Sequence, residues 1–267
     1  MASRISALAS LLILGSVPAV ARVETGFLDR TVSVDGSSYR YQVYVPADFR
    51  SKKSWPIILF LHGAGERGTD GLLQTDVGIG HAVRQNATRF PFVVILPQCV
   101  KDKIWGEPDM QAQALAALDA SIKEFHGDRK HVYVTGLSMG GYGTWDLAAR
   151  NPGRFAAIVP ICSGVQPNKE WPQLRVTLVD DPKINGPKIA DPFAEVAHRI
   201  GKTPVWMFHG DADPMVPVEQ SRHMAEALKA AGADFKYTEY PGVDHNSWDK
   251  AYAEPELVPW LLSHSLR

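Results

Sequence analysis

Short runs of apolar and β-branched residues alternate with amphipathic stretches along most of the chain. The runs occupy residues 56–61, 92–96, 132–135, 155–159, 205–208 and 235–240. Each has the length and composition of a strand that is buried on both faces. Between the runs, helical spacing of apolar residues predicts helices at residues 111–125, 138–150, 191–200 and 219–231. Strands that alternate with helices predict a mostly parallel sheet with helices on both faces.

The beginning of the predicted sheet has a different pattern. Residues 31–34 and 39–45 alternate apolar and polar positions on the two sides of Asp35-Gly36. This pattern is typical of two antiparallel strands joined by a tight turn. We therefore predict an α/β fold in which an antiparallel N-terminal hairpin precedes the parallel strands.

The first residues have the features of an export signal. Arg4 provides a positive charge, residues 5–17 are apolar, and Ala19-Val20-Ala21 is a small-x-small cleavage site. We predict a signal peptide at residues 1–21, cleaved after Ala21, and a secreted or periplasmic single domain at residues 22–267. The apolar run is shorter than the roughly 20 residues of a spanning helix, so the mature chain is expected to have no membrane span. An uncleaved N-terminal anchor is the alternative.

The charge balance and the cysteine count limit the possible partners. The sequence has 28 Lys and Arg residues against 29 Asp and Glu residues, a net charge of −1, so a nucleic-acid partner is not expected. No Cys/His cluster has zinc-site spacing, and no metal is expected. Cys99 and Cys162 permit at most one disulfide, but their strands should be separated by two others. The pairing and the oligomeric state stay open.

The strongest chemical motif is G-x-S-x-G at residues 136–140, with Ser138 at its centre. It follows a predicted strand and opens a predicted helix, as in the nucleophile elbow of a serine hydrolase. The glycines relieve crowding at a turn that strains the serine backbone. We interpret Ser138 as a nucleophile rather than as an ordinary helix-capping serine.

A serine nucleophile needs a base and an acid that orients the base, and both should come from later loops. Asp213 follows the strand predicted at residues 205–208, and His245 follows the strand predicted at 235–240. The order Ser138, Asp213, His245 is the one expected for this kind of fold. Asp211 is the alternative acid. His62 and His209 precede glycines at strand ends and are expected to orient loops.

The glycine-rich loop after the first parallel strand is a candidate for binding the oxyanion. The backbone N–H of Met139, at a helix N-terminus, is the first expected donor. The second is expected at Ala64, with Gly63 as the alternative. Residues 63–68 also fit G-x-G-x-x-G, but Gly71 interrupts the expected helix and no acid follows at the spacing of a dinucleotide site. No cofactor is therefore expected.

Three tryptophans, Trp105, Trp171 and Trp248, lie in loops near the expected catalytic edge. We predict that they bind substrate, with packing roles as the alternative. Residues 163–202 are the least regular stretch, and they could form a small lid.

With these residues in place, the chain resembles the α/β-hydrolases of the secreted esterase and polyhydroxybutyrate-depolymerase-like group, which includes predicted peptidases of the prolyl-oligopeptidase family. The matching segments are LFLHGAGERG (59–68), TGLSMGGYGTW (135–145), HGDADPMVP (209–217) and YPGVDHNSW (240–248). The resemblance implies an α/β-hydrolase fold and supports Asp213 over Asp211. Residues 163–202 are longer than the group's pattern.

The residues and the resemblance together predict a serine carboxylesterase that acts through an acyl-enzyme on a small-molecule or polymer-linked ester. A peptidase or amidase is the alternative reaction. Acetyl or feruloyl esters of carbohydrates and storage polyesters are alternative substrates. An inactive binding protein on the same fold is the alternative outside enzymes.

Overall fold

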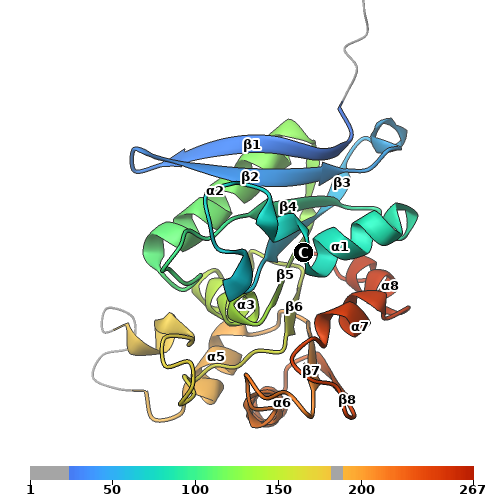
Figure 1. The fold of residues 1–267 in the computed structure, drawn as a ribbon. Helices are drawn as coiled ribbons and strands as arrows, with labels where there is room; N and C mark the ends of the chain where they lie inside the picture. The colour runs from blue at the N-terminus through green and yellow to red at the C-terminus, as the bar shows by residue number, and fades with distance from the viewer. Residues whose placement is uncertain (1–23, 182–188) are drawn as a thin grey trace, which may run out of the picture.

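The computed structural model describes residues 24–181 and 189–267, which contain one eight-stranded sheet (Figure 1). The strands are β1 (Gly26–Val34), β2 (Ser37–Val45), β3 (Trp55–Leu61), β4 (Val93–Pro97), β5 (Gly127–Leu137), β6 (Ala157–Ile161), β7 (Val205–Gly210) and β8 (Phe235–Tyr240). Their order across the sheet is β1-β2-β4-β3-β5-β6-β7-β8. β2 pairs antiparallel with both β1 and β4, and all other neighbouring strands pair parallel. The predicted α/β-hydrolase arrangement is confirmed.

The antiparallel hairpin turns where the sequence predicts it. Asp35 and Gly36 connect β1 to β2 and both have positive φ, 48° and 81°. Two consecutive residues with positive φ match the right-handed twist of the flanking strands. The leader predicted at residues 1–21 lies outside the described residues.

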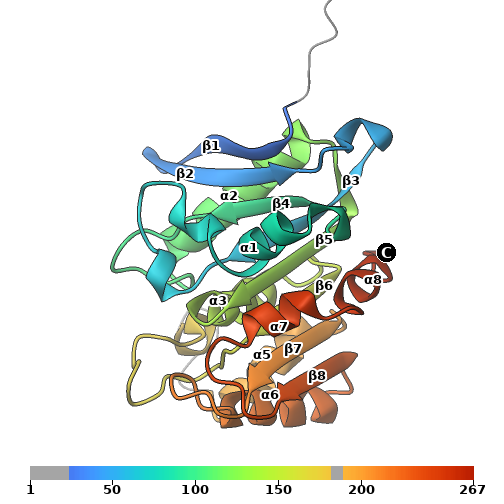
Figure 2. The same cartoon turned by 45° about the vertical axis from the view of Figure 1, so that its right-hand side comes forward.

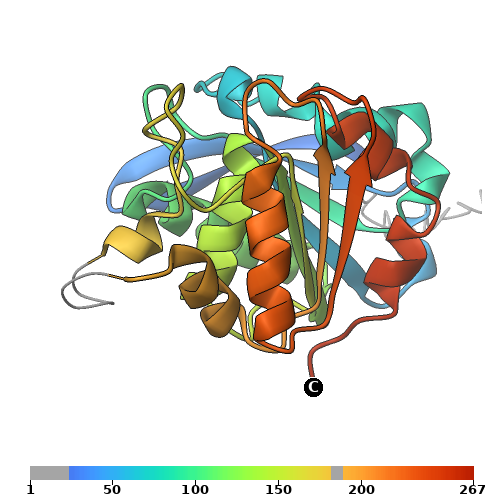
Figure 3. The same ribbon diagram turned by 90° about the horizontal axis from the view of Figure 1, so that it is seen from below.

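Helices cover both faces of the sheet. One layer contains α2 (Pro108–Glu124), α3 (Met139–Arg150), α5 (Pro192–Ile200) and α6 (Glu219–Ala230). The other contains α1 (Gly78–Gln85), α7 (Trp248–Ala253) and α8 (Leu257–Leu262). Figure 2 shows α1, α7 and α8 in front of the sheet, and Figure 3 shows α3, α5 and α6 on the side opposite to α7 and α8. None of the described helices is long and apolar enough to cross a membrane.

The continuous apolar runs are explained by burial on both faces. In β3, Ile57, Leu59 and Leu61 join the core beneath the first helix layer, while Ile58 and Phe60 join the core beneath the second. Successive side chains of a strand point to opposite faces, so a strand between two helix layers needs apolar residues at every position.

Three helices were not predicted from the sequence, namely α1, α7 and α8. They have six to eight residues each, and α8 contains Pro259. So short a segment offers two turns or fewer of apolar periodicity, which is too little to distinguish a helix from a loop. The predicted helices α2, α3, α5 and α6 are present within a few residues of their expected ends.

The two cysteines are buried and are not bridged. Cys99 follows β4 and Cys162 follows β6, and β3 and β5 lie between these strands in the sheet. The geometric objection to a disulfide therefore holds. Burial raises the pKa of the Cys99 thiol to about 12, so it is protonated at neutral pH.

Candidate active site

Ser138 occupies the sharp turn between a strand and a helix. β5 ends at Leu137 and α3 begins at Met139, so one residue makes the whole turn. Ser138 has φ 52° and ψ −119°, a backbone conformation that residues other than glycine rarely adopt. Such strain costs about 1–3 kcal/mol and is typical of functional sites.

The two glycines of the motif are required by close packing. A Cβ on Gly140 would lie 1.8 Å from the carbonyl oxygen of Leu61, at the end of β3. A Cβ on Gly136 would lie 2.3 Å from the carbonyl oxygen of Gly140. Both distances are far inside van der Waals contact with backbone atoms. The serine turn is therefore pressed against the neighbouring strand, as the sequence motif predicts.

The structure brings Ser138, His245 and Asp213 together in a chain of hydrogen bonds. His245 Nε2 lies 2.9 Å from Ser138 Oγ, and His245 Nδ1 lies 2.7 Å from Asp213 Oδ2. Because a carboxylate only accepts hydrogen bonds, we assign the imidazole proton to Nδ1. This tautomer leaves Nε2 free to accept the proton of the serine hydroxyl.

Asp213 is held as a charged carboxylate in a fully buried position. Its Oδ1 accepts the backbone N–H groups of Met215 at 2.8 Å and Val216 at 2.9 Å. Burial raises the pKa of Asp213, but hydrogen bonds from His209, His245 and Val216 outweigh burial, so the pKa lies well below its ordinary range. The contact with His209, at 3.2 Å from its Nε2 to Asp213 Oδ2, was not predicted from the sequence.

Asp211, the alternative acid, has a structural contact instead. Its Oδ1 accepts the backbone N–H of Gly242 at 2.6 Å. The Ala212 N–H donates to the Val243 carbonyl at 3.1 Å, so the loops that carry Asp213 and His245 are bound to each other. Asp211 therefore helps to hold the two loops together, whereas Asp213 contacts the histidine.

The two expected oxyanion donors, Met139 and Ala64, lie on either side of Ser138 in the fold, one in α3 and one in the loop after β3. Met139 is in the first turn of α3, where N–H groups have no partner within the helix. Ala64 is the first residue of the 3-10 helix η2 (Ala64–Glu66), and both Ala64 and Ser138 line one pocket. The backbone of Gly63 hydrogen-bonds the Glu66 carboxylate, as in a capping box. This contact engages Gly63 and favours Ala64 as the second donor.

The pocket at Ser138 has a volume of about 230 Å³ and mostly apolar walls. Its lining consists of Gly63, Ala64, Gly65, Glu66, Leu137, Ser138, Trp171, Leu174, Met215, Val216, His245 and Trp248. Trp171 and Trp248 lie in this lining, so their predicted contact with substrate stays a prediction. Leu174, Met215 and Val216 were not predicted, because an isolated apolar residue in a loop carries no recognisable motif.

Trp105 does not line this pocket, so the prediction that it binds substrate is wrong. It is 2% exposed, and its indole N–H donates to the His62 carbonyl at 2.9 Å. The ring packs edge-on against His62 with 5.0 Å between the centroids. The large apolar ring is buried in the core, and it anchors the end of β3 rather than a ligand.

His62 orients the glycine-rich loop, as expected. Its Nδ1 lies 2.6 Å from the Gly63 carbonyl oxygen, and its Nε2 accepts the Cys99 N–H at 2.9 Å. Burial lowers the pKa of His62 to about 4, so the ring is neutral at neutral pH. The loop forms η2, and α1 begins only at Gly78, so the helix that a dinucleotide fingerprint opens is missing here.

A buried acid fixes the stretch of chain that contains Trp171 and Leu174. Asp146 of α3 is fully buried and accepts the N–H of Thr177 at 2.8 Å and the N–H of Leu178 at 3.2 Å. The Arg150 Nε–H donates to it at 2.9 Å. Residues 163–181 thus place the side chains of Trp171 and Leu174 in the pocket of Ser138. The contacts of Asp146 attach the same stretch of chain to α3 just after these two residues. The predicted lid covered residues 163–202, but α5 (Pro192–Ile200) belongs to the helix layer. Among the described residues, only 163–181 therefore remain as a candidate lid.

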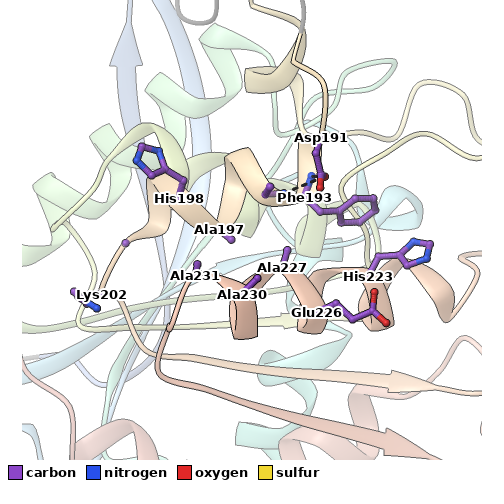
Figure 4. A pocket seen from close by; sticks show the side chains of 12 residues that line it. Asp191, Phe193, Ala197, His198, Lys202, His223, Glu226, Ala227, Ala230 and Ala231 are labelled. Carbon is purple, nitrogen blue, oxygen red and sulfur yellow. Dashed lines mark hydrogen bonds between the residues drawn. The ribbon is translucent and has the colours of Figure 1, made fainter.

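A wider pocket, of about 840 Å³, lies between α5 and α6 (Figure 4). Small side chains from both helices, such as Ala197, Ala227 and Ala230, leave this space open. Its lining shares no residue with the serine pocket and contains neither serine nor cysteine. We therefore assign the reaction chemistry to the smaller pocket.

The sheet topology and the serine at the β5–α3 turn define an α/β-hydrolase. Residues 102–264, more than half of the chain, match the model of the prolyl oligopeptidase family. The chain belongs to this family.

Three comparisons show how broad the similarity is. A thermostable esterase of known crystal structure is 32% identical with a TM-score of 0.71, over 90% of this chain and 63% of that one. Dipeptidyl-peptidase 5 of Porphyromonas gingivalis is 23% identical over 265 residues, 88% of this chain and 38% of that protein. An uncharacterized secreted protein of Arthroderma benhamiae is 29% identical over 210 residues, 71% of this chain and 21% of that protein. The chain thus spans less than half the length of these two curated relatives.

Proposed function

We propose that this protein is a serine hydrolase that cleaves carboxylic esters through an acyl-enzyme. The observation that carries the proposal is the chain of contacts at the strained Ser138. His245 lies 2.9 Å from its hydroxyl oxygen and 2.7 Å from Asp213. A nucleophile, a base and an orienting acid within hydrogen-bond reach are the groups that acyl transfer needs.

In the proposed reaction, Ser138 Oγ attacks the ester carbonyl carbon while its proton moves to His245 Nε2. The carbonyl oxygen becomes an oxyanion that accepts the N–H groups of Met139 and Ala64. The tetrahedral intermediate collapses, the alcohol leaves with the proton from His245, and an ester on Ser138 remains. Water then attacks this ester in the same way, which releases the acid and restores the serine. Asp213 stabilises the imidazolium throughout.

The pocket supports an apolar acyl group of limited size. Its walls include Trp171, Leu174, Val216 and Trp248, and its volume of about 230 Å³ exceeds the roughly 150 Å³ of a cavity that admits benzene. We infer that a short acyl chain or a single aromatic ring fits beside Ser138. The carboxyl of Glu66 is engaged by backbone N–H groups, which leaves it less available to bind a substrate amine.

An ester substrate is favoured over a peptide by the similarity to the thermostable esterase, which extends over 90% of this chain. Peptide cleavage is the second candidate, because the chain is also similar to a dipeptidyl-peptidase along most of its length. Acetyl or feruloyl carbohydrate esters and polyesters fall within the proposed class. A binding protein without turnover is the alternative outside it.

A substrate panel tests the reaction and the acyl preference. We expect p-nitrophenyl butyrate and a feruloyl ester to be hydrolysed at least about 100-fold faster, in kcat/KM, than dipeptidyl p-nitroanilides. Palmitoyl esters should be poorer than butyryl esters, because a long chain exceeds the pocket. Faster cleavage of the anilides would reverse the ester proposal. A folded protein that hydrolyses none of these compounds would favour the binding alternative.

We also propose that the protein is exported. The support is the charged, apolar and small-x-small pattern of residues 1–21, together with the relative that is described as secreted. Mass spectrometry of the protein recovered from the periplasm or the medium should give Arg22 as its first residue. Recovery of the full-length chain in the membrane fraction would support the uncleaved anchor.

A further inference from the structure

His209 is a second histidine on the proposed catalytic carboxylate. It lies in β7, and its side chain is fully buried. Its Nε2 is 3.2 Å from Asp213 Oδ2, the same oxygen that His245 Nδ1 approaches at 2.7 Å. One carboxylate oxygen therefore faces two imidazole rings, one from the buried strand and one from the pocket.

The neighbours of His209 determine which of its nitrogens carries hydrogen. Nε2 lies 3.0 Å from the Val216 carbonyl oxygen as well as near Asp213, and both of these groups only accept hydrogen bonds. Nε2 therefore carries a hydrogen. Nδ1 lies 2.7 Å from Ser221 Oγ in α6, and the same hydroxyl lies 3.4 Å from the Ser163 carbonyl oxygen. A hydrogen on Nε2 satisfies the contacts with both Asp213 and Val216.

We propose that His209 is a positioning residue for the reaction. Its Nε2–H, with the other side of the ring held by Ser221, holds Asp213 Oδ2 in the position from which this carboxylate orients His245. Ser221 is buried as well, so the contacts reach from α6 through β7 to the pocket. The inference rests on the proposed function, because His209 acts here only through Asp213 and His245.

The shared oxygen gives this role a recognisable signature. An N–H donor from His209 disperses part of the negative charge of Asp213. Loss of this donor would leave more negative charge facing His245 and would stabilise the protonated form of its ring. Because the base must be neutral to accept the serine proton, activity would then be lost at a higher pH on the acidic side. Loss of packing alone would lower activity at every pH without moving the acidic limb of the pH–activity profile.

Further ionisable side chains interact with these residues. Tyr142 and Cys162 lie near Asp213, Glu239 lies near His209, and Glu66 lines the pocket together with His245. Burial raises the pKa of the phenol and of the thiol, so both are neutral at neutral pH. A hydrogen bond from Arg222 lowers the pKa of Glu239, which stays charged. Burial raises the pKa of Glu66, but this residue is the same in all the variants below. A difference between variants is therefore attributable to the contacts of His209.

Two substitutions at position 209 separate the roles of the two ring nitrogens. A glutamine amide reaches the place of Nε2 and keeps a donor toward Asp213, whereas an asparagine amide reaches only the place of Nδ1. We expect His209→Gln to stay within about threefold of wild-type kcat/KM for p-nitrophenyl butyrate, with an unchanged acidic limb. We expect His209→Asn to lose about tenfold, with the acidic limb about half a pH unit higher. A pH-stat assay from pH 5 to 9 measures both quantities.

Ser221→Ala is the milder second variant, and it decides the question if the position-209 variants do not fold. It removes the hydroxyl that holds the Nδ1 side of the His209 ring, so we expect a smaller loss in the same direction, with the acidic limb again moved upward. Thermal unfolding shows whether each variant is folded. Equal losses in both position-209 variants without a shift of the limb, or an unshifted limb in a folded Ser221→Ala variant, would overturn the proposal. Turnover that does not need Ser138 would instead overturn the proposed function.

Discussion

Replacing Ser138 by alanine is expected to reduce kcat for p-nitrophenyl butyrate by about 10⁴- to 10⁶-fold. The hydroxyl oxygen is the atom that forms the bond to the acyl carbon, and no other described residue that lines this pocket has a hydroxyl or a thiol. The residual rate should come from the Met139 and Ala64 N–H groups and from substrate binding. Initial rates at saturating substrate measure the loss, and stability should change by no more than about 1 kcal/mol because alanine occupies the same turn.

A buried serine close to the site provides the matched control. Ser163 is 3% exposed, and its side chain packs beside Gly141 in the first turn of α3. Ser163→Ala removes the same hydroxyl group and should keep activity within a few fold of the wild type. Near wild-type turnover in Ser138→Ala would show that another group attacks the ester.

Replacing Gly140 by alanine is expected to destabilise the fold by more than about 4 kcal/mol, the range of exceptional single substitutions. The new Cβ would lie 1.8 Å from the Leu61 carbonyl oxygen, so β3 or the serine turn must move. The apparent melting temperature should fall by about 8 °C or more for a chain of this size. Any folded fraction should also lose activity, since the loop that follows β3 supplies the Ala64 N–H.

Gly65→Ala is the comparison for this prediction. Apart from the local backbone and its chain neighbours, no described heavy atom lies within 4 Å of a Cβ built on Gly65, and its φ is not positive. Its melting temperature should therefore stay within about 2 °C of the wild type. If Gly140→Ala were as stable as Gly65→Ala, close packing would not be what maintains the serine turn.

The proximity of Ser138, Asp213 and His245 could be predicted from the sequence because topology limits where these residues can be. Parallel strands bring their carboxyl ends to one edge of the sheet, so the residues that follow β5, β7 and β8 must meet there. Ser138, Asp213 and His245 each follow one of these strands, and their contacts agree with that expectation. The resemblance to known hydrolases favours Asp213 over Asp211 on the sequence pattern alone.

The pocket walls were less predictable, because position near the edge does not determine where a side chain points. Trp105 and Trp171 have similar positions in loops at this edge. Trp105 is buried against His62, whereas Trp171 lines the pocket. Asp146 was missed for a related reason. A single acid inside a helix has no motif, and its role depends on backbone N–H groups that are 31 and 32 residues away.

The contact of His209 with Asp213 could be predicted only in part. The sequence places the histidine at the end of a strand that leads to the acid, and this favours a role in loop orientation. It does not show that Nε2 shares the oxygen that holds His245, which depends on distances of 3.2 Å and 2.7 Å around Asp213 Oδ2. Which atoms contact Asp213 Oδ2 therefore follows from the structure and not from the sequence.

Covalent labelling with a fluorophosphonate tests the central claim most directly, because the phosphonyl group forms a bond to an activated serine as fluoride leaves. Peptide mass spectrometry should find the phosphonyl group on Ser138 in the wild-type protein, with the loss of ester hydrolysis matching the extent of labelling. His245→Ala should be labelled far more slowly. Full ester hydrolysis by protein that carries the label on Ser138, or complete inhibition with the label on a different residue, would contradict the account.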